Sequence, residues 1–468
     1  MEEELRSVID YGLSQGAKYV EARYQLLTGN VLSMKNGIVD NVGNYNIRGV
    51  GIRVIFENSI GFSSTNIINK ENLISTCNKA IKIAKAAKKR TVKFDSWRDY
   101  RDTCIVKPKI EYRSIEDIVN EFKEYDKRIV ENENRTVFRV FFISKTEEEK
   151  LFMNSEGSVI EQKWPIISLF ASLVAVDHQK GFVQRFLQDG GKKGWEIIHE
   201  IEYEEKLKSE AKMLGKILNE AETLKEKGEY DVIIDGEITG LISHESCGHP
   251  FEADRILGRE AAQGGESYLN LNMLNKEKIG SEILSIADDP TIEKASGFYV
   301  YDDEGVPARK RYLIKNGVPT EVLLNREYAG YLSTKSNSAA RATYYYNEPL
   351  IRMANTYIEP RDFTVEEMIE DVKKGIYLKS YMEWNIDDRR WNQKYTGLEC
   401  YLIENGKIKQ LLKNVALEIT TGHLFKNIDA IGKDLKFTPG NCGKGEPMQG
   451  IPVWFGGPTI RVRKVWIK

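Results

Sequence analysis

The sequence lacks an excess of charge of either sign. Its 468 residues include 68 Lys and Arg against 70 Asp and Glu, which gives a net charge of -2. A protein that binds nucleic acid or an anionic membrane through its overall charge usually has a strongly basic surface. The composition therefore predicts neither a nucleic-acid partner nor a membrane partner.

Long hydrophobic runs are also missing. The longest apolar stretch, residues 165–176, contains Ser168 and Ser172 and is shorter than the roughly 18 residues that a membrane-spanning helix needs. The start of the chain, residues 1–5, is acidic and lacks the basic and apolar zones of a secretory signal. We therefore expect a cytoplasmic protein.

Cysteine is scarce, and its spacing is irregular. An odd number of scattered cysteines does not fit the paired spacing of a small disulfide scaffold. We expect reduced thiols, each of which is either inert or a metal ligand. The five cysteines are Cys77, Cys104, Cys247, Cys400 and Cys442.

The composition that is present fits a globular protein of two domains. Hydrophobic residues make up 41% of the chain and charged residues 29%, which is typical of a protein with a large buried core. A chain of this length exceeds what one ordinary core serves. The polar, helix-ending run Lys225-Glu226-Lys227-Gly228 marks the boundary, so we predict an N-terminal domain of residues 1–228 and a C-terminal domain of residues 229–468.

The patterns predict an α+β protein. The N-terminal domain should be α/β, with an antiparallel sheet and amphipathic helices. Its signals include one apolar helix face, an Asn-Gly hairpin turn, a capping box and a buried strand over residues 137–143. The C-terminal domain should be mainly β and should carry a short helix with His244 and Glu245. The residues behind these signals are Leu5, Val8, Ile9 and Gly12 for the helix face, Asn36 and Gly37 for the turn, and Ser114 and Asp117 for the capping box.

Two of the five histidines lie within one short segment, His244-Glu245-Ser246-Cys247-Gly248-His249. Neutral imidazoles suit a borderline-soft cation such as Zn²⁺, and a neighbouring carboxylate can take a proton from water activated by the metal. The segment therefore indicates peptidase chemistry, with His244 and His249 as metal ligands and Glu245 as the general base. The alternative is a plain helix with one buried and one exposed histidine.

The spacing of the two histidines predicts an irregular helix. Residues five apart diverge by about 140° on an ideal α-helix, so both rings cannot reach one metal. Gly248 is permissive, and Pro250 pushes His249 away from α geometry. A π-type bulge, whose ring closes five residues back, would also align the pair.

A third ligand has to come from elsewhere in the chain, because a catalytic zinc site usually has three protein ligands. The best candidate is Cys442, in the glycine-rich segment from Thr438 to Gly445. A tight loop there can approach another surface, and the adjacent Lys444 would favour the thiolate. A plain loop cysteine is the alternative.

Several segments, in this order along the chain, resemble the TldD/PmbA family of metallopeptidases. They are residues 238–249 with 252–255, Asp288-Asp289-Pro290-Thr291, residues 301–308, residues 352–357 and Cys442-Gly443-Lys444-Gly445. The resemblance covers most of residues 230–468 and is only general before them. It implies a first domain that is α/β and a second that is largely β.

The resemblance also implies roles for single residues. His244 and His249 match the family's metal-binding histidines, Glu245 its general base and Cys442 its third ligand. Because the catalytic TldD-type subunit has this set and the PmbA (TldE)-type subunit lacks it, the chain resembles the catalytic type. The family implies a Zn²⁺ cofactor, a substrate that is an unfolded or modified peptide, and a homodimer or a heterodimer with a PmbA-like subunit.

Other roles stay open at this stage. His423 is either an oxyanion donor or a structural histidine, and Arg352 and Asn355 either bind substrate or fix loops. Cys247 is expected to be a small packing residue. Two rival functions are a cysteine hydrolase that uses Cys442 with His423 as base, and a noncatalytic peptide-binding or scaffold subunit of a TldD/PmbA-type complex.

Overall fold

The computed structural model describes residues 1–87, 92–110, 113–258 and 266–467. Within these residues the strands form sheets of seven, six, two and ten strands, and helices pack against them. The predicted α+β class is confirmed. The division into domains at residues 228 and 229 stays a prediction.

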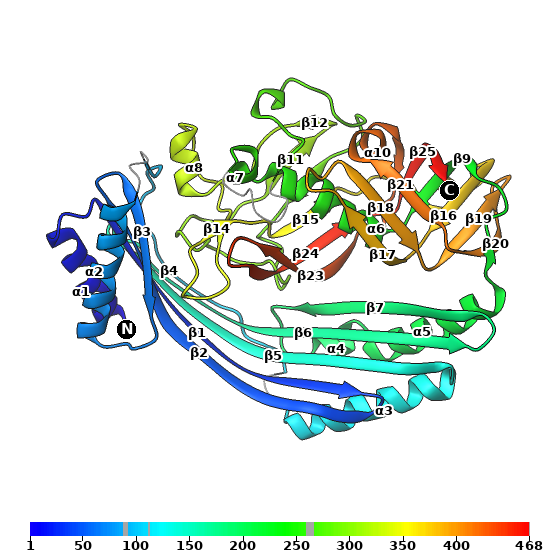
Figure 1. Cartoon of the computed structure of the whole chain (residues 1–468), viewed down its shortest axis with the longest axis horizontal. Coiled ribbons are helices and arrows are strands. Elements are labelled where there is room, and N and C mark those ends of the chain that lie inside the picture. The colour runs from blue at the N-terminus through cyan, green and yellow to red at the C-terminus, as the bar shows by residue number, and fades with distance from the viewer. Residues whose placement is uncertain (88–91, 111–112, 259–265, 468) are drawn as a thin grey trace.

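The first part of the chain forms the seven-stranded sheet, in the order β3-β2-β1-β5-β6-β4, with β7 also paired to β6. Its four longest strands, of 17 to 19 residues, are antiparallel and together form a long curved surface (Figure 1). The strands are β1 (Tyr19–Lys35), β2 (Ile38–Phe56), β3 (Ser59–Thr65), β4 (Arg101–Ile105), β5 (Thr136–Asn154), β6 (Val159–Asp177) and β7 (Gly181–Gly191).

Helices cover one face of this sheet and one of its ends. α1 and α2 share a buried apolar cluster with β1 and β2, and α3 and α5 share another with β5 and β6. Figure 1 shows α3 on one side of the sheet and the later part of the chain on the other. The helices are α1 (Glu2–Ser14), α2 (Lys70–Ala86), α3 (Ile115–Asn132), α4 (Ile197–Glu200) and α5 (Tyr203–Glu220).

Most local predictions for this region are confirmed. The expected face of α1 is buried, Ser114 and Asp117 form a reciprocal capping box, and Asn36 and Gly37 make the β1–β2 turn with positive φ angles of 50° and 74°. The strand predicted at residues 137–143 is present as part of β5, but the prediction that it is buried is wrong. Phe142 is 52% exposed, because only one face of β5 packs on the helices and the other borders an open cavity.

The later part of the chain is built from short strands that come from distant segments. A six-stranded sheet has the order β12-β11-β10-β15-β24-β23, and a ten-stranded sheet has the order β17-β18-β21-β25-β9-β16-β19-β20-β8, with β22 also paired to β25. β9 pairs parallel to β16, and β15 pairs parallel to β24, so long crossovers link these strands.

The strands of this region are β8 (Glu222–Thr223), β9 (Gly228–Ile234), β10 (Ile286–Asp288), β11 (Arg311–Lys315), β12 (Val318–Pro319), β13 (Ala340–Arg341), β14 (Leu350–Ile351), β15 (Asn355–Ile358), β16 (Lys374–Leu378), β17 (Tyr381–Ile386), β18 (Asn392–Gly397), β19 (Cys400–Glu404), β20 (Lys407–Lys413), β21 (Ala416–Thr420), β22 (Ile428–Ile431), β23 (Lys436–Lys444), β24 (Gln449–Gly457) and β25 (Ile460–Ile467). Cys442 lies on β23, which pairs with β24.

Helices in this region are short. They are α6 (Gly236–Ile242), α7 (Ala253–Ile256), α8 (Arg326–Tyr331), α9 (Val365–Glu370) and α10 (Thr421–Asn427), with a π-helix at Ser243–Gly248 and 3-10 turns at His249–Phe251 and Leu271–Met273. Across the described residues, no helix has both the length and the apolar character to cross a membrane.

Candidate metal centre

The two histidines lie on a helix that changes type between them. α6 passes into a π-helix at Ser243, and the backbone N–H of His249 donates to the carbonyl oxygen of His244, five residues back. A 3-10 turn begins at His249 and contains Pro250. The prediction of a distorted helix is therefore confirmed, and the π-type alternative is the one that occurs.

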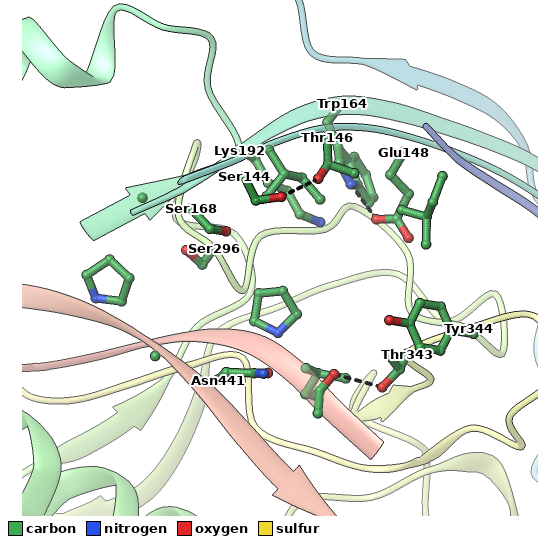
Figure 2. Close-up of a pocket in the computed structure, with 18 of the residues that line it drawn as sticks. Ser144, Thr146, Glu148, Trp164, Ser168, Lys192, Ser296, Thr343, Tyr344 and Asn441 are labelled. Carbon is green, nitrogen blue, oxygen red and sulfur yellow. Dashed lines mark hydrogen bonds between the residues drawn. The ribbon is translucent and has the colours of Figure 1, made fainter. Parts of the chain in front are cut away.

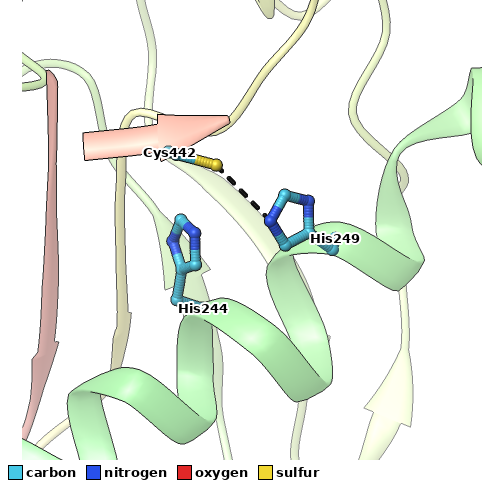
Figure 3. A group of neighbouring side chains, drawn as sticks. All are labelled: His244, His249 and Cys442. Carbon is cyan, nitrogen blue, oxygen red and sulfur yellow. Dashed lines mark hydrogen bonds between the residues drawn. The ribbon is translucent and has the colours of Figure 1, made fainter. Parts of the chain in front are cut away.

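This geometry brings the two imidazole rings together. Their centroids are 5.0 Å apart and their planes meet at 80°, so both rings present nitrogens to the same region (Figure 3). His244 is 4% exposed and His249 is 3% exposed. The alternative of one buried and one exposed histidine is wrong, because the π-turn places both on the inner side of the helix.

The helix packs closely on β24, and two glycines permit the approach. A Cβ atom at Gly236 would lie 2.4 Å from the carbonyl oxygen of Gly457, and one at Gly240 would lie 2.9 Å from that of Phe455. Any other residue would push the helix away from the strand. The helix is thereby held beside the hairpin of β23 and β24, which we call the ribbon.

Cys442 comes from the ribbon and completes the group. Its Sγ atom lies 3.4 Å from Nε2 of His249, and one ligand atom from each of His244, His249 and Cys442 lies within 4.8 Å of the others (Figure 3). All three side chains are buried. The structure thus joins residues that are far apart in sequence into one group of donors that could hold a metal ion.

Arg352 fixes the position of the cysteine. Its guanidinium is fully buried and donates to the carbonyl oxygens of Cys442 and Gln449, which lie on the two strands of the ribbon. Asn355 plays a similar part, because its side-chain amide donates to the carbonyl of Asp289 and accepts from the N–H of Gly297. Of the two roles left open for these residues, the contacts favour loop fixing.

A carboxylate that the sequence analysis missed supports His249. Oε2 of Glu252 lies 3.1 Å from Nδ1 of His249, on the side of the ring away from Cys442. Arg255 and Lys444 bind the same carboxylate at 2.6 and 3.2 Å. Burial raises the pKa of Glu252, but Lys444, His249 and Arg255 outweigh it and hold the pKa well below its usual range. The anion therefore orients the ring, as outer carboxylates do at metal sites.

The protonation states suit metal binding at neutral pH. Burial lowers the pKa of both His244 and His249. Burial opposes the thiolate of Cys442, yet His249 and Arg352 lower the pKa of this thiol to about 7. The expectation that Lys444 favours the thiolate is wrong, because its ammonium points instead to Glu252 and Asp254.

Glu245 follows His244 on the π-helix and is 7% exposed. Its Oε2 atom is buried and has no hydrogen-bond partner, so one carboxylate oxygen is available as a proton acceptor. Nε of Arg390, which belongs to the β17–β18 turn, lies 3.5 Å from that oxygen. Nothing in the spacing of Arg390 along the sequence indicated this contact.

Comparison with known proteins adds to this geometry. A family model described as the PmbA/TldA metallopeptidase C-terminal domain matches residues 227–468, which is more than half of the chain. The chain belongs to the PmbA/TldD metallopeptidase family. Models of the family's domain 1 and central domain match residues 20–84 and 106–221.

The chain is also similar to individual members of the PmbA/TldD family. Metalloprotease MJ0996 of Methanocaldococcus jannaschii is 32% identical over 448 residues, 95% of each chain. A protein of Saccharolobus solfataricus named zinc metalloprotease TldD homolog is 36% identical over 239 residues, 51% of each chain. The crystal structure of TldE from Thermococcus kodakarensis has the same fold, with a TM-score of 0.78, 18% identity and 99% of each chain covered.

Two other residues of this PmbA/TldD chain that the sequence analysis considered have no place in the metal centre. His423 is exposed on α10, and its Nε2 atom is 3.0 Å from the carbonyl oxygen of Lys464. Since Cys442 contacts His249, a cysteine hydrolase with His423 as base has no support in the contacts. Cys247 is fully buried in the apolar core, which confirms its predicted packing role.

Proposed function

We propose that this chain is a zinc-dependent peptidase in which His244, His249 and Cys442 hold the ion and Glu245 acts as general base. The observation that carries the proposal is the convergence of these three donors within 4.8 Å, from a π-helix and a strand that are far apart in sequence. The name of the Saccharolobus solfataricus relative, a zinc metalloprotease, supports the choice of metal.

The donor set fits zinc. Two imidazoles and a thiolate are ligands that Zn²⁺ prefers, and three protein ligands leave one position open for chemistry. Atoms bound to one tetrahedral zinc lie roughly 3.3–3.6 Å apart, and the contact between Cys442 and His249 is 3.4 Å. Nδ1 of His244 is buried without a hydrogen-bond partner, so this ring lacks the second contact that a purely structural histidine would have.

The protein groups would divide the work of peptide hydrolysis. A zinc ion held by the three donors supplies Lewis-acid chemistry, which activates water and polarises a peptide carbonyl. Glu245 would take a proton from water at its Oε2 atom, which accepts no hydrogen bond from the described residues and lies 3.5 Å from Nε of Arg390, and can pass it to the leaving amine. Glu252 holds the ring of His249, and Arg352 holds the backbone of Cys442.

The burial of the centre bears on the substrate. Donors that are only 3 to 6% exposed are out of reach of a folded protein, whose backbone is already paired within its own structure. An extended chain can present its backbone to such a site. The substrate is therefore an unfolded or modified peptide.

The working assembly is a homodimer or a heterodimer with a PmbA-like subunit, which sedimentation of the protein alone and with such a subunit would test.

The test of the proposed function is Glu245→Gln. An amide of nearly the same shape cannot take the proton, so turnover of an unfolded peptide should fall by about 10² to 10⁴. Bound zinc, measured by metal analysis, should be unchanged. Glu266→Gln, at an exposed carboxylate, is the control and should retain full turnover. Loss of zinc together with activity in Glu245→Gln would contradict the assignment of this residue as a base.

One observation favours a second candidate function. Cys442, His249 and Glu252 lie in the order of a nucleophile, a base and an orienting carboxylate, with contacts of 3.4 and 3.1 Å. A cysteine hydrolase built this way would keep its turnover after chelation and in His244→Ala. The zinc peptidase would lose turnover in both cases, so the pair of measurements separates the two functions.

A further inference from the structure

A cavity of about 760 Å³ lies between the curved sheet and the ribbon, outside the metal centre. Its size is in the range of sites for small ligands, which is about 300–1,000 Å³. One wall is the inner face of β1, β2, β5, β6 and β7, and the other includes the ribbon and residues 299–303 and 341–344. Figure 2 shows Trp164, Lys192 and Glu148 on the first wall and Asn441 on the second.

The ribbon separates this cavity from the metal centre. Asn441 and Pro452 are paired across the two strands, and both line the cavity. Cys442 is the next residue on β23, and its side chain contacts His249. Because successive side chains of a strand point to opposite faces, one face of the ribbon serves the metal centre and the other borders the cavity.

The sheet wall changes from apolar to charged along its length. Cross-strand pairs of β5 and β6 line it in order, starting at the aromatic pair Phe142 and Phe170 and ending near the pair Glu148 and Trp164. Phe170 also stacks on Phe186 of β7, with ring centroids 6.1 Å apart, which holds the ring of Phe170 in place. A ligand that fills the cavity should therefore be apolar at one end and charged at the other.

Two buried cations mark the charged end. Lys192 is 4% exposed, its Nζ atom lies 3.4 Å from the ring centroid of Trp164, and it donates to the carbonyl oxygen of Phe298 at 2.5 Å. Arg341 is 8% exposed and donates to the carbonyl oxygens of Met353 and Pro452. Among the described residues, no carboxylate lies within 4.0 Å of either cation.

The acids that line the cavity already have partners. Glu148 and Asp303 pair with Lys150, Asp189 pairs with Lys206, and Asp302 accepts from three backbone N–H groups. Burial lowers the pKa of Lys192 well below its usual range; Glu148 and Asp303 oppose this shift, and Lys150 and Arg341 add to it. No carboxylate of the described residues contacts the ammonium of Lys192 directly, so an anionic ligand placed there would favour its charged form.

We propose that this cavity binds the C-terminal end of an apolar peptide. The terminal carboxylate lies at Lys192 and Arg341, and the apolar side chains lie along the wall towards Phe142 and Phe170. The site is distinct from the metal centre and holds a peptide by its end. The proposal rests on the proposed function only in that its ligand is a peptide.

Binding is tested with two probes that differ only at the terminus, acetyl-Leu-Leu-Phe with a free carboxylate and its carboxamide. Titration calorimetry uses the Glu245→Gln chain without added metal, so that nothing is cleaved. Because hydrogen bonds to a charged group are about twice as strong as neutral ones, the acid should bind at least about tenfold more tightly than the amide. Equal affinities would overturn the proposal.

Three variants locate the site. Lys192→Met should abolish the preference for the acid. Lys193→Met is the matched control, since the neighbouring lysine pairs with Glu200 and lies outside the cavity lining, and it should keep the preference. Ser168→Trp, at an exposed position in the cavity wall, should block both peptides without disturbing the core. A preference that persists in Lys192→Met, or unchanged binding in Ser168→Trp, would overturn the proposal.

A second copy of the chain is another occupant that the experiment can detect. If it filled the cavity, peptide affinity would fall as protein concentration rises, and sedimentation would show the peptide dissociating a dimer; that outcome overturns the proposal. Because the titration needs neither metal nor turnover, its failure leaves the proposed peptidase untouched. A chain that binds the peptide but never cleaves one would contradict only the proposed function.

Discussion

Buried charged side chains have different kinds of partner on the two faces of the ribbon. On the face towards the metal centre, Glu252 has three positively charged or ring-nitrogen partners, and Lys444 has two carboxylates. On the face towards the cavity, Lys192 and Arg341 have only carbonyl oxygens as acceptors. A buried charge without a counter-charge is costly. The first face is complete without a ligand anion, whereas the second, in our proposal, receives one.

The largest expected effect comes from breaking the compensated face. Glu252→Gln removes the anion that Arg255 and Lys444 share, so the free energy of unfolding should fall by about 3 kcal/mol. Lys192→Met removes a cation that no carboxylate in the described part of the chain contacts directly, so it breaks no ion pair and should change the free energy of unfolding by less than about 1 kcal/mol. Urea denaturation of the metal-free proteins measures both. Equal losses would show that the two faces do not differ in this way.

Metal removal should affect one face only. Zinc at a hundred times its dissociation constant should stabilise the native chain by about 2.7 kcal/mol, because it binds the folded donors. A chelator should reverse this shift, and Cys442→Ala should abolish it. Peptide binding in the cavity should be the same with and without the chelator. A thermal melt that zinc does not move would argue against the three-donor site.

One charge pair at the cavity should make stability depend on pH. Lys150 and Arg23 outweigh burial and lower the pKa of Asp303 to about 2. The ordinary value of 3.8 is higher, so the pair stabilises the fold above about pH 4, and this contribution is lost as pH falls towards 2. Asp303→Asn should therefore cost about 2 kcal/mol at pH 7 and clearly less at pH 3. The loss of stability caused by Asp303→Asn is measured from urea midpoints at the two pH values. An equal loss at pH 7 and at pH 3 would contradict the ion pair as its cause.

The smallest predicted effect compares two buried arginines that hold the ribbon. Arg352 donates to Cys442 and Gln449, and Arg341 donates to Met353 and Pro452. A lysine keeps the charge but lacks the planar fork that reaches two carbonyls. Arg352→Lys should weaken zinc binding about tenfold, or about 1.4 kcal/mol, because Cys442 is less firmly held. Competition with a zinc-binding dye should show no such change for Arg341→Lys.

Much of the local structure could be predicted from the sequence. The Asn36-Gly37 turn and the Ser114–Asp117 capping box follow from the conformations and hydrogen bonds that these residues favour. The five-residue spacing of His244 and His249, with Pro250 after them, required a distorted helix, and a π-helix is present. These features depend on residues close together in the chain, so their pattern is visible without the fold.

Other features were decided by the tertiary structure. Residues 137–143 look like a buried strand because they are apolar, yet only the packing of α3 and α5 on one face of β5 determines which side chains are covered. Glu252 and Lys444 are ordinary charged residues in sequence, and the fold alone makes them partners beside His249. The sequence left two roles open for Arg352, substrate binding and loop fixing, and only its contacts distinguish them.

The sequence by itself determined the chemistry that the chain carries: two imidazoles, a carboxylate between them and a glycine-flanked thiol. The tertiary structure decided that these groups meet, and that two cations without a described carboxylate in direct contact, Lys192 and Arg341, lie behind the same ribbon. The physical reason is the range of the interactions. Turns, caps and helix type are set by neighbouring residues, whereas the approach of Cys442 to His249 depends on the packing of the helix, β24 and Arg352 together.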